Sequence, residues 1–312
     1  MTAMLNRPSA TRRMAPGSWR GWARKQARLT YVLPAAIFLG ILAFFPLFQL
    51  VRMSVSAVTS ANLNGNWAFI GFANFAANAQ NPVFWQALGN TAIFVVVVTV
   101  LSLVGGFAAA AALRASGRLP AFLLGLMVFI WALPPVVNGS VWKFLLGDEG
   151  LFNVVLKATG LAHLPVPFLY DPHIALYSVA LVNTWAIIPF NALVFRAALL
   201  GISPEILEAA KLDGASAWQE VRLVLIPAVR PTSLVLIVLT VVYAFRSFDF
   251  IYVMTYGGPG TATNTLPFLG YLQAFVQFNY GSGSATAIIA ALLVIVLAVI
   301  YARSVRKEES EL

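Results

Sequence analysis

Six long apolar runs alternate with shorter, more polar segments along the 312 residues of the chain. A membrane-spanning helix needs about 20 apolar residues to cross roughly 30 Å of hydrocarbon. Six segments meet that requirement: residues 31–53, 91–113, 121–146, 174–200, 232–254 and 285–302. The pattern therefore predicts an all-α polytopic membrane protein with six transmembrane helices.

Three of the predicted spans contain proline, which removes a backbone hydrogen bond and kinks a helix. The prolines are Pro34 and Pro46 in the first span, Pro134–Pro135 in the third and Pro189 in the fourth. Lipid cannot replace the lost hydrogen bond, so a kinked helix must pack against protein or border a wet cavity. We expect these helices either to pack against one another or to line a polar pathway.

Lys and Arg are distributed unevenly among the connections between spans. Of 20 such residues, 16 lie in residues 1–30, in the 114–118 connection, in residues 196–231 and after residue 302. Connections 54–90 and 255–284 contain none, and 147–173 contains only Lys157. Cytoplasmic loops carry the excess of Lys and Arg. This predicts a basic cytoplasmic segment at 1–30, a membrane domain at 31–302 with a cytoplasmic 201–231 loop, and a cytoplasmic tail at 303–312.

The composition narrows the class further. The chain is 60% hydrophobic and 10% charged, with a mean hydropathy of +0.83. These values exclude a soluble enzyme, a disordered regulator and a nucleic-acid binder, despite a net charge of +9. The absence of cysteine excludes disulfides and thiolate metal sites. We expect the two histidines, His163 and His173, to be ordinary exposed residues of an outer loop, and we predict neither a metal site nor a catalytic one.

The predicted cytoplasmic loop 201–231 carries strong helix signals. Ser203 suits an N-cap, Pro204 suits the first helical position, and Glu205 complements the helix dipole there. The pattern predicts a short helix through Leu212 that ends at Gly214, where a left-handed residue is needed.

A second helix is predicted directly after this stop. Ser216 and Gln219 form the pattern of a capping box. We expect Pro227 to end this second helix and Pro231 to open the fifth span. The loop is thus expected to be a rigid helix–glycine–helix hairpin, suited either to docking a partner or to lying on the lipid surface.

The residues of this hairpin resemble a known motif. Glu208-Ala209-Ala210, then Gly214, then Val224-x-Ile226-Pro227, resemble the EAA loop of binding-protein-dependent ABC importer permeases, and the longer form with Asp213 is similar to the carbohydrate branch. The resemblance extends along nearly the whole chain, through Ile70-Gly71-Phe72-x-Asn74-Phe75, Phe84-Trp85, Asn90-Thr91, Trp142-Lys143, Gly150-Leu151-Phe152-Asn153, Trp185, Pro189-Phe190, Phe248-Asp249, Thr255 and Gly257-Gly258-Pro259. Apolar Val221, Val224 and Ile226 depart from the commonest residues of the motif but keep its character.

The resemblance implies a type I ABC importer permease fold in the inner (cytoplasmic) membrane of a bacterium. It implies that a coupling helix docks in a groove of an ATPase, through Glu208, Ala209, Ala210, Asp213 and Gly214. It also implies four kinds of partner besides the lipid bilayer: a second, related permease chain, two ATPase subunits, an extracytoplasmic solute-binding protein and a sugar.

We find no phosphate-binding loop of the G-x-x-x-x-G-K-[ST] type in the sequence. Gly105-Gly106 lies among alanines within the second span, which favours close helix packing. Gly257-Gly258 is expected to form a turn. The chain is therefore predicted to be no enzyme and to hold no cofactor of its own, with ATP and magnesium bound by the partner ATPase subunits.

Charged residues near the middle of a span usually face a cavity or a partner. The fifth predicted span contains Arg246 and Asp249, three residues apart, together with Tyr243 and Ser247. One interpretation is a purely structural ion pair; the other is that these four residues line a polar pathway in which Asp249 orients Arg246. The resemblance to maltose-type permeases favours the pathway. It adds Ile187 and Phe190, beside the Pro189 kink, and more loosely Asn138.

Aromatic faces with polar groups suit a sugar or oligosaccharide as the transported solute. Glycerol phosphate or a polyol stays open, since Arg246 suits a phosphate. An ion-coupled secondary transporter, using Arg246 and Asp249 as a charge relay, is the alternative from a different class.

Overall fold

The computed structural model describes the backbone of residues 19–115 and 117–309, and the side chains of residues 31–115, 117–299 and 303. Most of the basic N-terminal segment, residues 1–18, and the end of the tail, residues 310–312, lie outside the described residues. The chain divides into two compact units, Met1–Leu50 and Val51–Leu312, which are considered separately.

The first unit consists, in its described part, of most of helix α1 (Trp19–Ser54). Pro34 and Pro46 lie inside α1 without ending it. The stretch Tyr31–Ser54 is long and apolar enough to cross a membrane, which agrees with the first predicted span. Its large apolar side chains are exposed, as a helix that faces lipid or another chain requires.

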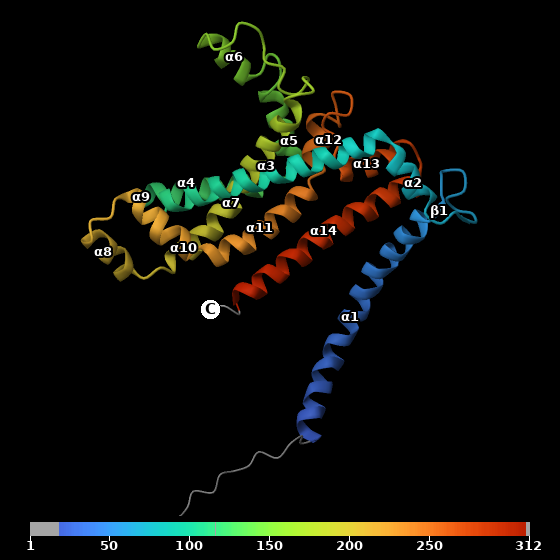
Figure 1. The fold of residues 1–312 in the computed structure, drawn as a ribbon, viewed down its shortest axis with the longest axis horizontal. Coiled ribbons are helices and arrows are strands. Elements are labelled where there is room, and N and C mark those ends of the chain that lie inside the picture. Colours follow the sequence, from blue (N-terminus) through green and yellow to red (C-terminus); the bar gives the residue numbers. More distant parts are fainter. Residues whose placement is uncertain (1–18, 116, 310–312) are drawn as a thin grey trace, which may run out of the picture. The chain divides into compact units, whose positions relative to one another are not determined.

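The second unit is built around two long helices, α3 (Pro82–Ala112) and α7 (Ala175–Leu200). They lie side by side over much of their length (Figure 1). A Cβ atom on Gly106 would lie 2.6 Å from the Cβ of Asn191, so only glycine permits this approach. The prediction that the Gly105-Gly106 pair serves close helix packing is therefore confirmed. Helices α11 (Arg230–Phe245) and α14 (Tyr280–Glu309) complete the group of long helices.

The third predicted span is not one straight helix. It is divided into α4 (Arg118–Ala132) and α5 (Pro135–Leu145), whose axes differ by 101°. Leu133 and Pro134 have extended backbone conformations. Two consecutive prolines explain the break, because each lacks an N–H group and each disfavours helix in the residue before it.

The fifth predicted span is also interrupted. Helix α11 ends at Phe245 and α12 (Asp249–Met254) begins after a break at residues 246–248. Together, Arg230–Met254 remain long and apolar enough to form one span. By length and composition, the described residues contain five spanning helices, or six if α4 and α5 count as one span. The prediction of six spans is thus met only with the bent pair included.

The connections predicted to lie outside the membrane contain regular structure that the sequence analysis did not assign. They hold β1 (Ser56–Ala57) paired antiparallel with β2 (Ala68–Phe69), and the helices α2 (Ala73–Gln80), α6 (Leu151–Ala158), α13 (Leu266–Tyr271) and the π-helix η2 (Leu272–Val276). Gly257 has a φ of +82°, which confirms the predicted turn, and both histidines are exposed as expected.

The 201–231 loop forms the end of the second unit that lies away from α2, α12 and α13 (Figure 1). It contains α8 (Pro204–Leu212), α9 (Ala217–Glu220), the π-helix η1 (Val221–Leu225) and α10 (Ile226–Ala228). We call residues 203–228 the coupling element. The candidate pathway residues are carried by α5, α7, α11, α12 and the break between α11 and α12, so the two predicted sites lie on different parts of the second unit.

Candidate coupling element and translocation pathway

Helix α8 begins where the sequence predicts but is capped differently. Ser203 is the N-cap residue with extended backbone, yet in the described chain its side chain makes no bond to the backbone of the first turn. The Glu205 carboxylate accepts a hydrogen bond from its own backbone N–H, and secondly one from the Ser203 hydroxyl; both lower the pKa of Glu205. The helix start is therefore stabilised mainly by Glu205.

The turn after α8 has the predicted conformation. Gly214 has a φ of +77°, in the left-handed region that favours glycine. The Ala215 N–H donates to the Ala210 carbonyl at 3.0 Å, which closes the end of the helix. The prediction that Gly214 ends this helix is confirmed.

The capping box at the start of α9 is also present. The Gln219 N–H donates to Ser216 Oγ at 3.3 Å, and the Ser216 N–H donates to Gln219 Oε1 at 2.8 Å. Both bonds join residues three positions apart, so the start of α9 is fixed by its own sequence.

The prediction that Pro227 ends this second helix is wrong by one residue. The helix passes through η1 and continues in α10, whose last residue is Ala228, with Val229 as the C-cap. A π-helix bonds each N–H to a carbonyl five residues back and changes the local register of the ladder, which lets a proline follow without ending the helix. Pro231 opens α11 as predicted.

The residues predicted to dock on an ATPase are mostly accessible. Glu208, Ala209, Asp213 and Gly214 are exposed, and Ala210 is half-buried. Large apolar side chains on the same element are exposed as well, namely Leu212 at 89%, Trp218 at 68% and Ile206 at 52%. A short, capped helix that presents small and apolar side chains beside two carboxylates has the surface of a docking element.

One ion pair joins the coupling element to the rest of the second unit. Arg114 follows the end of α3, and its Nη2 lies 2.7 Å from Oε1 of Glu220, the last residue of α9. Arg196, near the end of α7, donates from Nε to the Leu113 carbonyl at 3.0 Å. Sequence analysis counted Arg114 and Arg196 only as signals of membrane orientation; their partners lie 106 and 83 residues away in the sequence.

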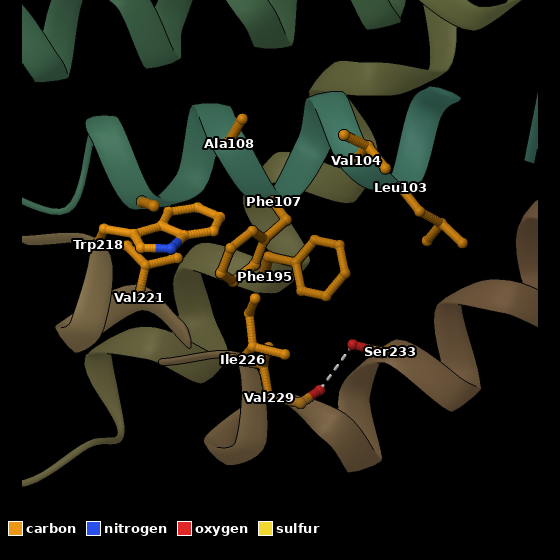
Figure 2. A pocket seen from close by; sticks show the side chains of 11 residues that line it. Leu103, Val104, Phe107, Ala108, Phe195, Trp218, Val221, Ile226, Val229 and Ser233 are labelled. Carbon is orange, nitrogen blue, oxygen red and sulfur yellow. Dashed lines mark hydrogen bonds between the residues drawn. The ribbon is translucent and has the colours of Figure 1, made fainter. Parts of the chain in front are cut away.

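An apolar pocket of about 560 Å³ lies between this element and the body of the second unit (Figure 2). Trp218 and Val221 form one wall and Phe107 and Ala108 of α3 another. Ser233 and the indole N–H of Trp218 are the polar groups of the lining, and the Ser233 hydroxyl already donates to the Val229 carbonyl at 3.0 Å. The pocket is otherwise apolar, and we do not assign the pathway to it.

The predicted pathway residues line two smaller pockets that share Tyr243. One, of about 260 Å³, is lined by Pro135, Tyr243, Arg246, Ser247, Asp249 and Phe250. The other, of about 280 Å³, is lined by Trp131, Ile187, Phe190, Leu239, Thr240 and Tyr243. The structure thus brings together six of the seven predicted residues.

Asn138 is the seventh, and neither of these two pockets has it in its lining. It lies buried on α5, three residues after Pro135, which does line one of them. The sequence analysis missed Trp131. Its ring stacks on Phe190, with centroids 5.6 Å apart and planes 27° apart. Nothing local marks this tryptophan, because it stands in an apolar run and only the bend after α4 brings it to α7.

Arg246 and Asp249 do not form the ion pair that was one interpretation. Both are described residues, and their charged groups are not within 4.0 Å of each other. Arg246 is exposed, and Asp249 is half-buried in the first turn of α12, where a carboxylate complements the helix dipole. The purely structural ion pair is therefore not observed, nor is a direct contact through which Asp249 would orient Arg246; both residues line the 260 Å³ pocket.

The break between α11 and α12 is held from α7. Asn183 is fully buried, and its Nδ2 donates to Ser247 Oγ at 2.7 Å. Among the described residues, Asn183 Oδ1 and Thr184 Oγ1 are buried without a hydrogen-bond partner. A second polar chain crosses the helices nearby, from Thr240 to Asn191 at 3.3 Å and from Asn191 to Ser102 at 3.1 Å. Polar side chains thus border the pockets within a largely apolar body.

Comparison with known proteins identifies the family to which the chain belongs. Residues 102–309 match the family model described as "Binding-protein-dependent transport system inner membrane component". The chain is 32% identical over 278 residues to the sn-glycerol-3-phosphate transport system permease protein UgpA of Agrobacterium fabrum, covering 88% of this chain and 93% of that one. It is 29% identical over 283 residues to the trehalose/maltose transport system permease protein MalF of Thermococcus litoralis, covering 89% and 93%.

The fold is shared with solved structures. A chain in the crystal structure of a bacterial ABC transporter involved in the import of the acidic polysaccharide alginate superposes with a TM-score of 0.79, at 21% identity, covering 93% of this chain and 98% of that one. The family match over more than half of the chain favours an ABC importer permease over the ion-coupled secondary transporter. The chain belongs to the family of binding-protein-dependent transport system inner membrane components, the permease subunits of ABC importers.

Proposed function

We propose that this chain is the permease subunit of an ATP-driven importer of a sugar or oligosaccharide. It forms half of the translocation pathway. The coupling element transmits the conformational changes of a separate ATPase to that pathway. The importer class follows from the family; the substrate class and the residues that serve it are the proposal.

The observation that carries the sugar assignment is the stacked pair Trp131–Phe190 beside Tyr243. Sugar rings present C–H faces that pack on aromatic rings, and hydroxyls that need polar partners. Those partners are supplied next to the rings by Arg246, Ser247 and the shared Tyr243. Two similar proteins support the assignment, since one is named for trehalose and maltose and the other for alginate.

The coupling element supports the proposal that a separate chain hydrolyses ATP and docks on this permease. An exposed helix with Glu208 and Asp213 at its surface offers charge-assisted hydrogen bonds to a partner. ATP and Mg²⁺ are bound by two copies of that ATPase and not by this chain, and a second, related permease completes the pathway. An extracytoplasmic binding protein delivers the solute to the surface formed by residues 54–90, 147–173 and 255–284. The location is a bacterial inner membrane, with both termini and the coupling element in the cytoplasm.

Glycerol phosphate, or a polyol, is the second candidate solute. The observation that favours a phosphate is the exposed Arg246, which lines a pocket and has no carboxylate of the described residues within 4.0 Å. An arginine guanidinium binds phosphate oxygens with two parallel hydrogen bonds. The glycerol-phosphate permease of Agrobacterium fabrum is among the similar proteins.

The test is purification of the chain with its partners from the native host in a mild detergent. The binding protein that accompanies the complex is screened by calorimetry with disaccharides, oligosaccharides, glycerol 3-phosphate and polyols. The complex is then reconstituted with that binding protein in vesicles, and uptake is measured with and without ATP. We expect ATP-dependent uptake of a sugar.

Two results decide against the proposal. Binding and uptake of glycerol 3-phosphate or a polyol, with no sugar bound, establish the second candidate instead. Uptake that follows an ion gradient and needs no ATP overturns the importer mechanism, and with it the role of the coupling element.

A further inference from the structure

The coupling element is joined to the second unit by the chain itself at two points. Its start follows α7 through Gly201 and Ile202, and its end continues through Val229 into α11. Leu225 and Val229 are buried against the apolar ends of α3 and α7, so this second point is packed. Leu207 of α8 and Val221 and Val224 of η1 also pack against this cluster, whereas no residue of α9 belongs to it.

On the side of the coupling element that faces α3, side-chain packing leaves a pocket. The pocket of about 560 Å³ separates Trp218 and Val221 from Phe107, Ala108 and Ala111 (Figure 2). Trp218 remains 68% exposed. Apolar contact between α9 and α3 is therefore incomplete on that side.

The Arg114–Glu220 ion pair lies on this same side. The two side chains are 28% and 13% exposed, which shields the pair from solvent and strengthens it relative to a surface pair. Within the described part of the chain, Arg114 Nη1 is buried without a hydrogen-bond partner. Loss of Glu220 therefore leaves a largely buried guanidinium without its counter-charge.

The arginine side of the pair is itself anchored. Leu113, the residue before Arg114, caps α3, and its carbonyl accepts the hydrogen bond from Arg196 of α7. Gly106 packs against Asn191 two turns deeper, so α3 and α7 meet as one rigid pair. That pair carries Ile187 and Phe190 of the candidate pathway on α7.

We propose that Arg114 and Glu220 are positioning residues for coupling: their ion pair attaches α9, the part of the coupling element outside the apolar cluster, to the end of α3. The pair limits movement of α9 relative to α3, so that a displacement of α8 by an ATPase moves α3 and α7 rather than turning the element in place. This inference rests on the proposed function, because it assigns the pair to the transmission step of that transporter.

The first test is a charge swap in the reconstituted transporter. Glu220→Arg and Arg114→Glu are each expected to leave assembly and ATP hydrolysis in place, while the solute moved per ATP falls about tenfold. The double variant Arg114→Glu/Glu220→Arg is expected to return to within about threefold of the wild type, because the pair is restored with its polarity reversed. Arg118→Glu, at an exposed arginine of the same connection, is the matched control and is expected to keep the wild-type ratio.

A second measurement does not depend on transport. The chain has no cysteine, so spin labels attach only at introduced positions. Lys211→Cys on α8 and Val100→Cys on α3, both exposed, report the orientation of the coupling element in the assembled complex. The distance distribution is expected to be narrow with the ion pair intact, broad in Glu220→Gln, and narrow again in the double swap.

Two results overturn the inference. One is a single-charge variant that assembles and keeps both the wild-type ratio and the narrow distribution. The other is a double swap that assembles but restores neither. If the wild-type complex shows no ATP-driven uptake, the proposed function fails, and the spin-label distances still decide whether the pair restrains the element.

Discussion

The coupling element and the candidate pathway are both built at a break in helical structure, and the two breaks are held in different ways. Around Gly214, the bonds that shape the turn join residues three to five positions apart. Around Ser247, the bond comes from Asn183, which is 64 residues away on another helix. One break is fixed by local sequence and the other by the assembled fold.

This difference predicts which substitutions affect only the structure around them. A substitution at the Gly214 turn alters an exposed surface and leaves the helix packing of the membrane part as it is. A substitution near Ser247 acts on a pocket wall that three helices share, namely α5, α11 and α12. Substitutions can therefore disrupt the two sites separately, and measurements of transport and of ATP hydrolysis distinguish the two kinds of effect.

The largest effect is expected at the coupling turn. Gly214→Asp places a side chain and a charge where φ is +77°, and Glu208→Lys reverses a charge on the proposed docking surface. We expect uptake to fall by more than about tenfold, with membrane insertion intact and ATP hydrolysis no longer linked to transport. Uptake, ATPase activity and the amount of inserted chain are measured in the same vesicles.

A matched control is available for the glycine. Gly160, after α6, has a φ of +71° and, like Gly214, faces open space where a Cβ would stand. Gly160→Asp thus introduces the same backbone strain far from the docking surface and is expected to keep coupling. Equal losses in Gly160→Asp and Gly214→Asp, or normal uptake in the Gly214 and Glu208 variants, contradict the docking role.

The next largest effect is expected at Arg246. Arg246→Ala removes the exposed cation of the 260 Å³ pocket, so uptake is expected to be lost or redirected to a different solute. Arg246→Lys keeps the charge without the forked geometry and is expected to retain part of the activity. Uptake rates are compared across the panel of sugars and glycerol 3-phosphate, with Lys157→Ala, at an exposed lysine of an outer connection, as the control. Unchanged affinity and rate in Arg246→Ala would make it a structural charge.

The contrast between the two breaks also explains what the sequence revealed. The Gly214 stop and the Ser216–Gln219 capping box are correct because each depends on neighbouring residues. The cap of α8 is placed correctly but assigned to the wrong side chain, since Glu205 competes with Ser203 for the same backbone donors. The error at Pro227 has a similar origin, because the π-helical register before it does not show in a pattern of residue types.

Long-range features escaped prediction for the opposite reason. The six apolar runs were visible, and Pro134–Pro135 marked the kink in the third span, but the break at residues 246–248 is held by Asn183 of another helix. Six of the seven residues predicted for the pathway, from charge and from resemblance, line the two pockets, and Trp131, which carries neither signal, was not among the seven. The Arg114–Glu220 pair was not predicted, because its members are 106 residues apart.

A moderate effect is expected from the aromatic pair of the pathway. Trp131→Leu removes the ring that stacks on Phe190 but keeps an apolar side chain. Stacking is worth about 1 kcal/mol, so the apparent KM for a sugar is expected to rise about fivefold with a smaller change in maximal rate. Trp85→Leu, at an exposed tryptophan of α3 outside the two pockets, serves as the control. An equal shift in both variants, or a shift equally large for glycerol 3-phosphate, contradicts a role for the ring in holding sugar.

The smallest effect is expected at the start of α8. It tests whether the structure of the coupling element depends only on interactions between neighbouring residues. The pKa of Glu205 is lowered in the folded chain, so its carboxylate stabilises the folded state fully above the ordinary range of glutamate, and this contribution is lost as pH falls through the lowered pKa. The thermal midpoint of Glu205→Gln is therefore expected to lie slightly below that of the wild type near neutral pH and to converge with it on acidification. Ser203→Ala removes one of the two hydrogen bonds and is expected to give a smaller gap with the same convergence. Because both bonds lie within three residues of the helix start, neither variant should change the substrate preference of the transporter. A difference in thermal midpoint that does not depend on pH contradicts the assignment of the cap to Glu205.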